Sequence, residues 1–277
     1  MDNPANEEPS ADGDVFGLRG KVMLVVGGGA AGDGIGNGRA AAILLARAGA
    51  EVMVVDRKLD LAETTARMIR AGRGRASTFA ADVTDEDACR DMVAATVDAC
   101  GRLDGLVNNV GIGSRGSVVA SSLSDWQRVM RINVETMFLA SKFAIPAMID
   151  SGDGGAIVNI SSISALRPRG LTAYSTSKGA VIALTRAMAV DHGPDGIRVN
   201  CVAPGPVYTP MVHAGGMSDT AREQRRRASV LNIEGTGWDV GMTVRYLLSS
   251  QSRYVTGQTI VVDGGVSLTG PSRDSAS

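Results

Sequence analysis

A tyrosine and a lysine in the stretch Ala173-Tyr-Ser-Thr-Ser-Lys-Gly-Ala180 have a spacing suited to acid–base chemistry. If this stretch is helical, Tyr174 and Lys178 lie one turn apart on one face, and an ammonium group stands beside a phenol. A free phenol has a pKa of about 10 and carries protons poorly at neutral pH. A neighbouring cation favours the phenolate, and lowering the pKa by about three units requires roughly 4 kcal/mol. An exposed tyrosine over a solvated lysine has the same spacing, so the pair needs support from the rest of the chain.

The elements that would position this pair alternate along the chain. Short continuous apolar runs are typical of strands buried on both faces, and helical patterns separate them. This order predicts one α/β domain with a doubly wound, Rossmann-like parallel sheet, right-handed crossovers and helices on both faces. Ligands would then bind beyond the carboxyl ends of the strands. We expect strands at 21–26, 51–56, 76–80, 103–108, 156–160, 197–202 and 259–262, and helices at 38–48, 59–71, 85–100, 124–149, 173–192 and 238–249.

Composition limits the class of protein. With 277 residues and 44% hydrophobic content, the chain can bury a substantial core. No apolar run approaches the roughly 20 residues that span a bilayer, and the N-terminus is acidic and polar. The net charge of -1 gives no reason to expect a nucleic-acid or membrane partner. We expect a polar, disordered leader at 1–16, a single domain at 17–269 and a tail at 270–277.

The cysteines and histidines do not have the spacing of a metal site. Three cysteines are an odd number for disulfide pairing, and only two histidines are present. We therefore expect no metal and a reducing, cytoplasmic compartment. The residues concerned are Cys89, Cys100, Cys201, His192 and His213.

A glycine-rich segment at 27–38 connects the first expected strand to a helix. Glycines there let the backbone approach a pyrophosphate, whose charge the helix N-terminus would meet. Asp56 ends the second strand, where a carboxylate can accept hydrogen bonds from ribose hydroxyls and would repel a 2′-phosphate. We therefore favour NAD(H) over NADP(H). The alternative stays open, because Arg57 and Lys58 could hold a phosphate if Asp56 turned away.

Two further strand ends carry polar residues. Asp82-Val83 closes the third strand, where the aspartate could meet an adenine edge or cap the helix expected from Asp85. Asn108-Asn109-Val110-Gly111 ends the fourth strand, where small residues let the chain pass close to a cofactor.

In combination, these motifs resemble the short-chain dehydrogenase/reductase family, in its shorter single-domain branch. The resemblance covers the chain from about residue 18 to 268. The matching features are the glycine-rich turn, Asp82-Val83, Asn108-Asn-Val-Gly111, Asn133, Ile157-Val-Asn-Ile-Ser-Ser162, Tyr174-x-x-x-Lys178, Ile197-Arg-Val-Asn-Cys-Val-Ala-Pro-Gly205, Thr256-Gly-Gln and Val262-Asp-Gly-Gly265.

The resemblance implies a seven-stranded sheet, a nicotinamide cofactor and interconversion of an alcohol and a carbonyl. By the same resemblance, Tyr174 is the general acid/base, and Lys178 lowers its pKa and hydrogen-bonds the nicotinamide ribose. Ser162 holds the substrate oxygen, and Asn133 supports a water in a proton relay. A base within reach of the alcohol oxygen is what hydride removal from the carbon requires.

Each of these roles has a structural alternative. Ser162 could be a strand-end cap, with Ser161 or Ser164 in its role. Asn133 could be a buried asparagine satisfied by backbone.

The glycine motif departs from the family pattern. Gly28 and Gly36 are separated by seven residues, where the family commonly has three, and Asp33 lies in this longer loop. We expect Gly28, Gly36, Asn37 and Gly38 to contact the cofactor.

Another segment, from Pro204 to Pro210, resembles the one that contacts the nicotinamide carboxamide. Its expected contacts are Pro204, Gly205, Val207 and Thr209. In the fourth-strand motif, Val110 replaces the usual alanine.

The segment at about 205–237 loses clear periodicity and is expected to be a substrate lid. Apolar residues there favour a moderately apolar secondary alcohol or ketone as the substrate. Arg167 and Arg169 precede Tyr174 and leave open a substrate with an anionic group. The arginines at 225–227 are flanked by acids and indicate a solvated face. The resemblance implies a homotetramer built partly from the helices at 124–149 and 173–192. An NADP(H)-dependent ketoreductase, or a non-catalytic nucleotide-sensing or scaffold protein on the same fold, are the alternative functions.

Overall fold

The computed structural model describes residues 14–213 and 216–268, and its centre is a parallel sheet. The seven strands have the order β3-β2-β1-β4-β5-β6-β7, which confirms the predicted doubly wound topology. They are β1 (Val22–Val26), β2 (Glu51–Asp56), β3 (Arg75–Ala80), β4 (Gly105–Asn108), β5 (Gly155–Ile160), β6 (Ile197–Pro204) and β7 (Thr259–Val262). The residues 1–13 of the expected leader, 214–215 of the expected lid and 269–277 around the expected tail lie outside the described residues.

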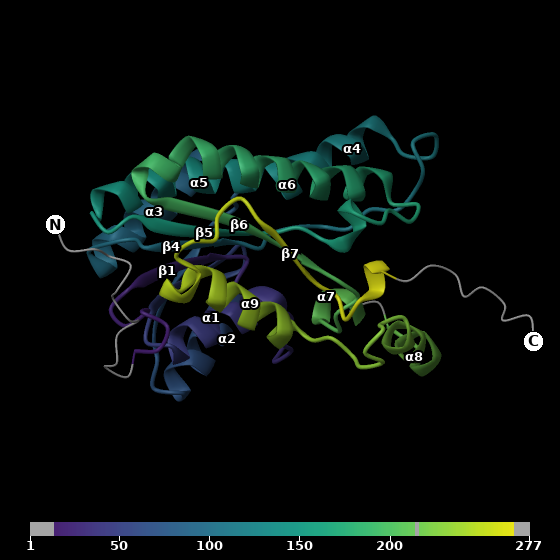
Figure 1. Ribbon diagram of the computed structural model, residues 1–277, viewed down its shortest axis with the longest axis horizontal. Coiled ribbons are helices and arrows are strands. Elements are labelled where there is room, and N and C mark those ends of the chain that lie inside the picture. The colour runs from purple at the N-terminus through teal and green to yellow at the C-terminus, as the bar shows by residue number, and fades with distance from the viewer. Residues whose placement is uncertain (1–13, 214–215, 269–277) are drawn as a thin grey trace, which may run out of the picture.

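Helices cover both faces of the sheet, and the two faces have separate apolar cores (Figure 1). Parallel strands that are covered on both faces bury nearly every side chain, which is why they read as continuous apolar runs. All five residues of β1 and all four of β4 are buried. One face carries α1 (Asn37–Arg47), α2 (Leu59–Ala71) and α9 (Gly237–Leu248); the other carries α3 (Glu86–Cys100), α5 (Thr136–Asp150) and α6 (Thr172–His192).

The predicted single helix at 124–149 is interrupted. The structure has α4 (Leu123–Met130), a π-helical turn at Arg131–Glu135 and then α5. A π turn adds a residue to the helical repeat and often marks a functional site. By length and composition, the whole stretch Leu123–Asp150 could cross a bilayer, but 44% of its most apolar window is buried in the domain. It is a core helix of the fold.

The segment expected to be an irregular lid contains two helices, α7 (Pro210–His213) and α8 (Asp219–Arg227). Ser218 caps α8 by accepting a hydrogen bond from the amide of Ala221 at 3.2 Å. Both helices lie at the same end of the molecule as α4 (Figure 1). Short 3-10 turns complete the described chain at Ile163–Ala165, Gly193–Asp195, Ser250–Ser252 and Val266–Leu268.

Residues just before the first strand pack against the domain. The carboxylate of Asp14 accepts hydrogen bonds from the amides of Leu18 and Arg19, at 3.2 and 2.9 Å. The guanidinium of Arg245 lies over the ring of Phe16, 4.0 Å from its centroid. These contacts connect the beginning of the described chain to α9.

Candidate active site

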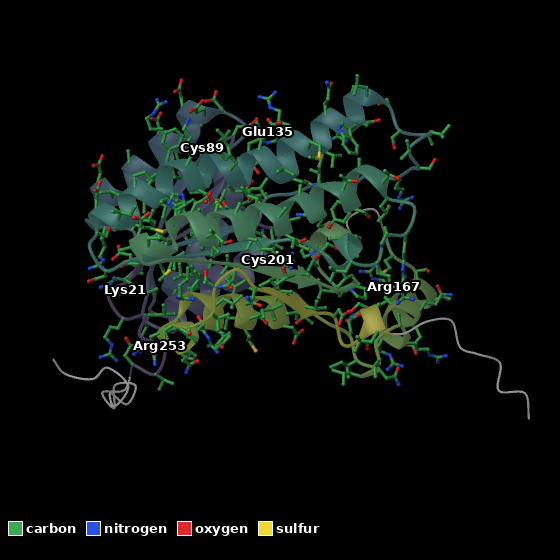
Figure 2. All side chains as sticks on the ribbon, turned by 45° about the horizontal axis from the view of Figure 1, so that its top comes forward. Lys21, Cys89, Glu135, Arg167, Cys201 and Arg253 are labelled. Atoms are coloured by element: carbon green, nitrogen blue, oxygen red, sulfur yellow. The ribbon has the colours of Figure 1, made fainter. Side chains whose placement is uncertain are left out.

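Tyr174 and Lys178 lie in the first turns of α6, beside the carboxyl end of β5. The helix places Lys178 Nζ over the phenol ring, 5.8 Å from the ring centroid. This end of the molecule is the one that carries Arg167, whereas Lys21 and Arg253 mark the opposite end (Figure 2). The structure therefore brings the tyrosine and the lysine together as their spacing predicts.

Ser162 follows β5 and reaches the phenol. Its hydroxyl is hydrogen-bonded to the side chain of Tyr174 and also accepts the amide of Ser164 at 3.1 Å. Ser162 therefore caps the strand end and also lies beside the phenol. The hydroxyl of Ser161 donates instead to the carbonyl of Lys178 at 2.7 Å and is buried under α6. Among the candidate serines, the geometry favours Ser162.

Burial controls the protonation of both α6 side chains. It raises the pKa of Tyr174 above its ordinary value, and the hydrogen bond with Ser162 lowers it by less. The expectation that Lys178 holds the phenol pKa low is therefore not met in the structure. Burial also lowers the pKa of Lys178 to about 8. Its Nζ donates to the carbonyl of Ile160 at 2.9 Å, which keeps the ammonium in place.

Asn133 lies in the π turn and connects α6 to the loop after β4. Its Oδ1 accepts the amide of Ile112 at 2.7 Å, and its Nδ2 donates to the Ile112 carbonyl and the Ser177 hydroxyl, both at 3.0 Å. A Cβ at Gly111 would lie 3.1 Å from Lys178 Nζ and 3.4 Å from Asn133 Oδ1. The side chain is satisfied largely by backbone, as its structural alternative predicted, and it also lies beside the lysine.

The glycine turn after β1 has close contacts at Gly27 and Gly38 that leave no room for a side chain. Gly27 has φ +80°, in the region that favours glycine, and its carbonyl accepts Asn109 Nδ2 at 2.7 Å. A Cβ at Gly38 would lie 2.1 Å from the Gly27 carbonyl oxygen. Gly36 is the N-cap of α1, which has no side-chain cap and no acid in its first turn. The free amides of this helix end are suited to an anion.

Asp56 faces the same turn from the end of β2. Its Oδ2 accepts the amide of Gly29 at 3.2 Å, and its Oδ1 accepts the amide of Lys58 at 3.1 Å. The carboxylate therefore points toward the glycine turn and does not turn away. Asp33, in the longer loop, is exposed to solvent.

A cavity of about 480 Å³ opens beside this carboxylate, in the size range of small-molecule sites. It gathers six of the residues predicted to bind the cofactor: Asp56, Arg57, Asp82, Val83, Asn109 and Gly111. Arg128, Arg131 and Ile132 also line it but were not predicted, because they precede Asn133 in a stretch read as an ordinary helix. The donor set fits an adenosine group with a neighbouring diphosphate.

Asp82 does not cap α3. Its Oδ1 accepts the amide and hydroxyl of Thr84, at 3.1 and 2.8 Å, and the hydroxyl is the main cause of the lowered pKa of Asp82. Asp85 is the cap, because its carboxylate accepts the amides of Asp87 and Ala88. Of the two readings, only the one that places Asp82 on the cavity wall is supported.

The predicted contacts after β6 lie elsewhere. Among the described residues, none of Pro204, Gly205, Val207 and Thr209 lines the cavity beside Asp56, and Val207 and Thr209, at the beginning of the expected lid, are buried. Met211 of α7 does line it. No periodicity in the lid sequence distinguished Met211 from its neighbours.

Known proteins match most of the length of this chain. A family model described as enoyl-(acyl carrier protein) reductase matches residues 29–267. The chain is 41% identical over 255 residues to 2-(S)-hydroxypropyl-CoM dehydrogenase 3 of Xanthobacter autotrophicus, covering 90% of this chain and 97% of that protein. It is 34% identical to meso-2,3-butanediol dehydrogenase of Serratia marcescens, covering 88% and 94%. The solved structure of 7α-hydroxysteroid dehydrogenase with NADH and 7-oxo glycochenodeoxycholic acid superposes with a TM-score of 0.85 at 30% identity, covering 92% of this chain and 98% of that one.

Proposed function

The chain belongs to the short-chain dehydrogenase/reductase family, and we propose that it transfers hydride between NAD(H) and a secondary alcohol or ketone, with Tyr174 as the general acid/base. It is an oxidoreductase that acts on CH–OH groups with a nicotinamide cofactor. The observation that carries the catalytic assignment is the hydrogen bond between Ser162 and the phenol, with the Lys178 ammonium over the same ring.

In this proposal, Tyr174 and Ser162 hold one oxygen atom of the substrate. During reduction the phenol donates a proton to the carbonyl oxygen, and during oxidation the phenolate accepts the proton of the alcohol. Because burial raises the pKa of Tyr174, the neutral phenol prevails at pH 7 and is ready to act as the acid. The nicotinamide, when bound, supplies or accepts the hydride.

The choice of NAD(H) is supported by the position of Asp56. Its carboxylate accepts two backbone amides and lines the cavity, where it would accept hydrogen bonds from ribose hydroxyls and repel a 2′-phosphate. Arg57 lines the same cavity and keeps NADP(H) as the alternative. Asp56→Ala should lower the ratio of kcat/KM for NAD over NADP by about 10-fold or more. An unchanged ratio would contradict the role of the carboxylate.

The substrate class is supported by the relatives' names, two of which denote dehydrogenases of secondary alcohols. The test is a panel of secondary alcohols and ketones, followed at the nicotinamide absorbance with NAD and NADP in parallel. We expect turnover of several members of the panel with NAD. Activity restricted to NADP would overturn the cofactor assignment, and no turnover by protein that binds NADH would overturn the substrate class.

We also propose a homotetramer in a reducing, cytoplasmic compartment. Exposed apolar side chains on α5 and α6, such as Phe138 at 51% and Val190 at 75% exposure, support burial of these helices against other copies. The three free cysteines of the described chain support the compartment. Light scattering of the purified protein tests the oligomer, and a monomer at micromolar concentration would contradict it.

A further inference from the structure

Arg39 is an arginine that the fold buries completely, although it stands in the first turn of α1. Its relative exposure is 0%. A cation in the first turn is unfavourable next to the positive end of the helix dipole, and burying a charge costs free energy unless hydrogen bonds compensate it. The arrangement is therefore costly unless the guanidinium has specific partners.

Those partners are the carbonyls of the longer glycine loop. Arg39 Nη1 donates to the carbonyls of Gly32 and Gly34, both at 2.7 Å, and Nη2 donates to the carbonyl of Ala30 at 2.8 Å. Every second peptide of the loop is thus bonded to one guanidinium. Because Arg39 is fully buried, these carbonyl oxygens face the interior of the loop.

The same guanidinium is also linked through Thr65 to Gly28, at the beginning of the loop. Arg39 Nε donates to the hydroxyl of Thr65 at 2.9 Å, and that hydroxyl donates to the carbonyl of Gly28 at 2.8 Å. The bonded carbonyls therefore run from Gly28 to Gly34, across the part of the loop that exceeds the family's usual length. Among the described residues, Arg39 forms no ion pair within 4.0 Å. Its direct partners are three carbonyls and one hydroxyl, and the carboxylates of Asp33 and Asp56 act on its charge from a greater distance.

We propose that Arg39 is a positioning residue for the cofactor diphosphate. It withdraws the carbonyls of the loop from the ligand side and keeps a positive charge beneath the loop, and both effects favour a bound diphosphate anion. The inference rests on the proposed use of a dinucleotide. It adds that an internal arginine shapes the longer loop of this chain.

The test separates the diphosphate from the adenosine. The dissociation constants of NADH, ADP and adenosine are measured for the wild type, Arg39→Met, Arg39→Lys and Thr65→Val. Arg47→Met is the matched control, because Arg47 is an exposed arginine in the last turn of the same helix. Thermal unfolding of each variant checks the fold.

We expect Arg39→Met to weaken NADH and ADP by about 10-fold or more and adenosine by less than about 2-fold. Lysine keeps the charge but cannot reach all three loop carbonyls, so Arg39→Lys should lie between the wild type and the methionine variant. Thr65→Val removes one link and should weaken NADH by about 3-fold. Arg47→Met should leave all three ligands unchanged.

Unchanged NADH affinity in Arg39→Met, or an equal loss for adenosine and ADP, would overturn the inference, since a merely structural role affects every ligand alike. If Arg39→Met does not fold, Arg39→Lys and Thr65→Val decide, and wild-type affinity for ADP in both would overturn it. Failure of the wild type to bind either NADH or NADPH would instead overturn the proposed function. The two failures are therefore distinguishable.

Discussion

The buried charges at the two ends of the sheet have different partners. At the amino end, Asp104 has a nearly buried carboxylate that accepts the amide of Val22 at 2.8 Å and pairs with Arg102 at 2.6 Å and Lys21 at 3.2 Å. At the carboxyl end, Lys178 and Arg39 are buried as deeply but are bonded to neutral carbonyls and hydroxyls. The two ends are marked by Lys21 and Arg167 in Figure 2.

We expect the paired charges to contribute mainly to stability and the unpaired charges to contribute mainly to function. A charge paired with an opposite charge is neutralised locally, and removing one partner leaves the other uncompensated. A charge held by neutral dipoles keeps its field for a ligand, at a cost to stability. Changes at the amino end should therefore act on folding, and changes at the carboxyl end should act on binding and turnover.

The largest effect is expected for Lys178→Met. Loss of the ammonium beside the phenol should lower kcat/KM by about 10²–10³-fold, measured at the nicotinamide absorbance. The free energy of unfolding near pH 7 should not fall by more than about 1 kcal/mol, because an apolar side chain replaces a buried charge. Lys142→Met, at an exposed lysine, is the control. A variant that is unstable but fully active per folded molecule would reverse the comparison.

At the amino end, Asp104→Asn should lower stability and leave turnover nearly unchanged. It leaves Arg102 without its nearly buried partner and should lower the free energy of unfolding by about 3 kcal/mol, measured by urea denaturation. Turnover per folded molecule should stay within about 2-fold of the wild type. A large loss of turnover with normal stability would show that the network at this end also serves the site.

The pH dependence of stability tests whether Lys178 at the carboxyl end is a buried charge without an acidic partner. In the unfolded chain Lys178 keeps its proton up to a pKa of 10.5, whereas in the folded protein it loses the proton near 8. Between these values the unfolded chain binds more protons, so rising pH favours folding. The difference corresponds to on the order of 3 kcal/mol. The free energy of unfolding of the wild type should therefore rise relative to Lys178→Met from about pH 8 to about pH 10, and parallel curves would contradict the buried ammonium.

The smallest effect is expected for Asp153→Asn. Asp153 also contacts Lys21 and Arg102, but its side chain is 56% exposed. Exposed ion pairs contribute about 0–1 kcal/mol, so the loss should lie in that range and disappear at high salt. A loss as large as that of Asp104→Asn would mean that exposure does not distinguish the two carboxylates.

The sequence predicted the strands and most helices because a sheet covered on both faces leaves long apolar runs. β2, α2 and β7 have the predicted bounds. The π turn was missed, since one added residue per turn hardly changes the apolar pattern. The helix α8 was missed because it has no buried residue, although Ser218 before Asp219 and the arginines in its last turn are helix-end signals.

The sequence predicted the placement of Tyr174, Lys178 and Asp56, but it missed contacts that depend on tertiary packing, such as those of Arg128 and Arg131 with the cavity. The spacing of Tyr174 and Lys178 and the placement of Asp56 at a strand end follow from helix and sheet geometry. The direction of the Tyr174 pKa was wrong, because burial depends on tertiary packing that spacing does not contain. Arg39 was not singled out, since its partners are carbonyls that any sequence has.

We propose that the phenol of Tyr174 carries the proton, and the variant Tyr174→Phe removes only the phenol hydroxyl. With an alcohol or ketone that the wild type accepts, kcat should fall by about 10²–10⁴-fold while the dissociation constant of NADH stays within about 2-fold. Tyr254→Phe, at a tyrosine that is 96% exposed, should change neither quantity. Turnover of Tyr174→Phe near the wild-type rate would show that another group carries the proton.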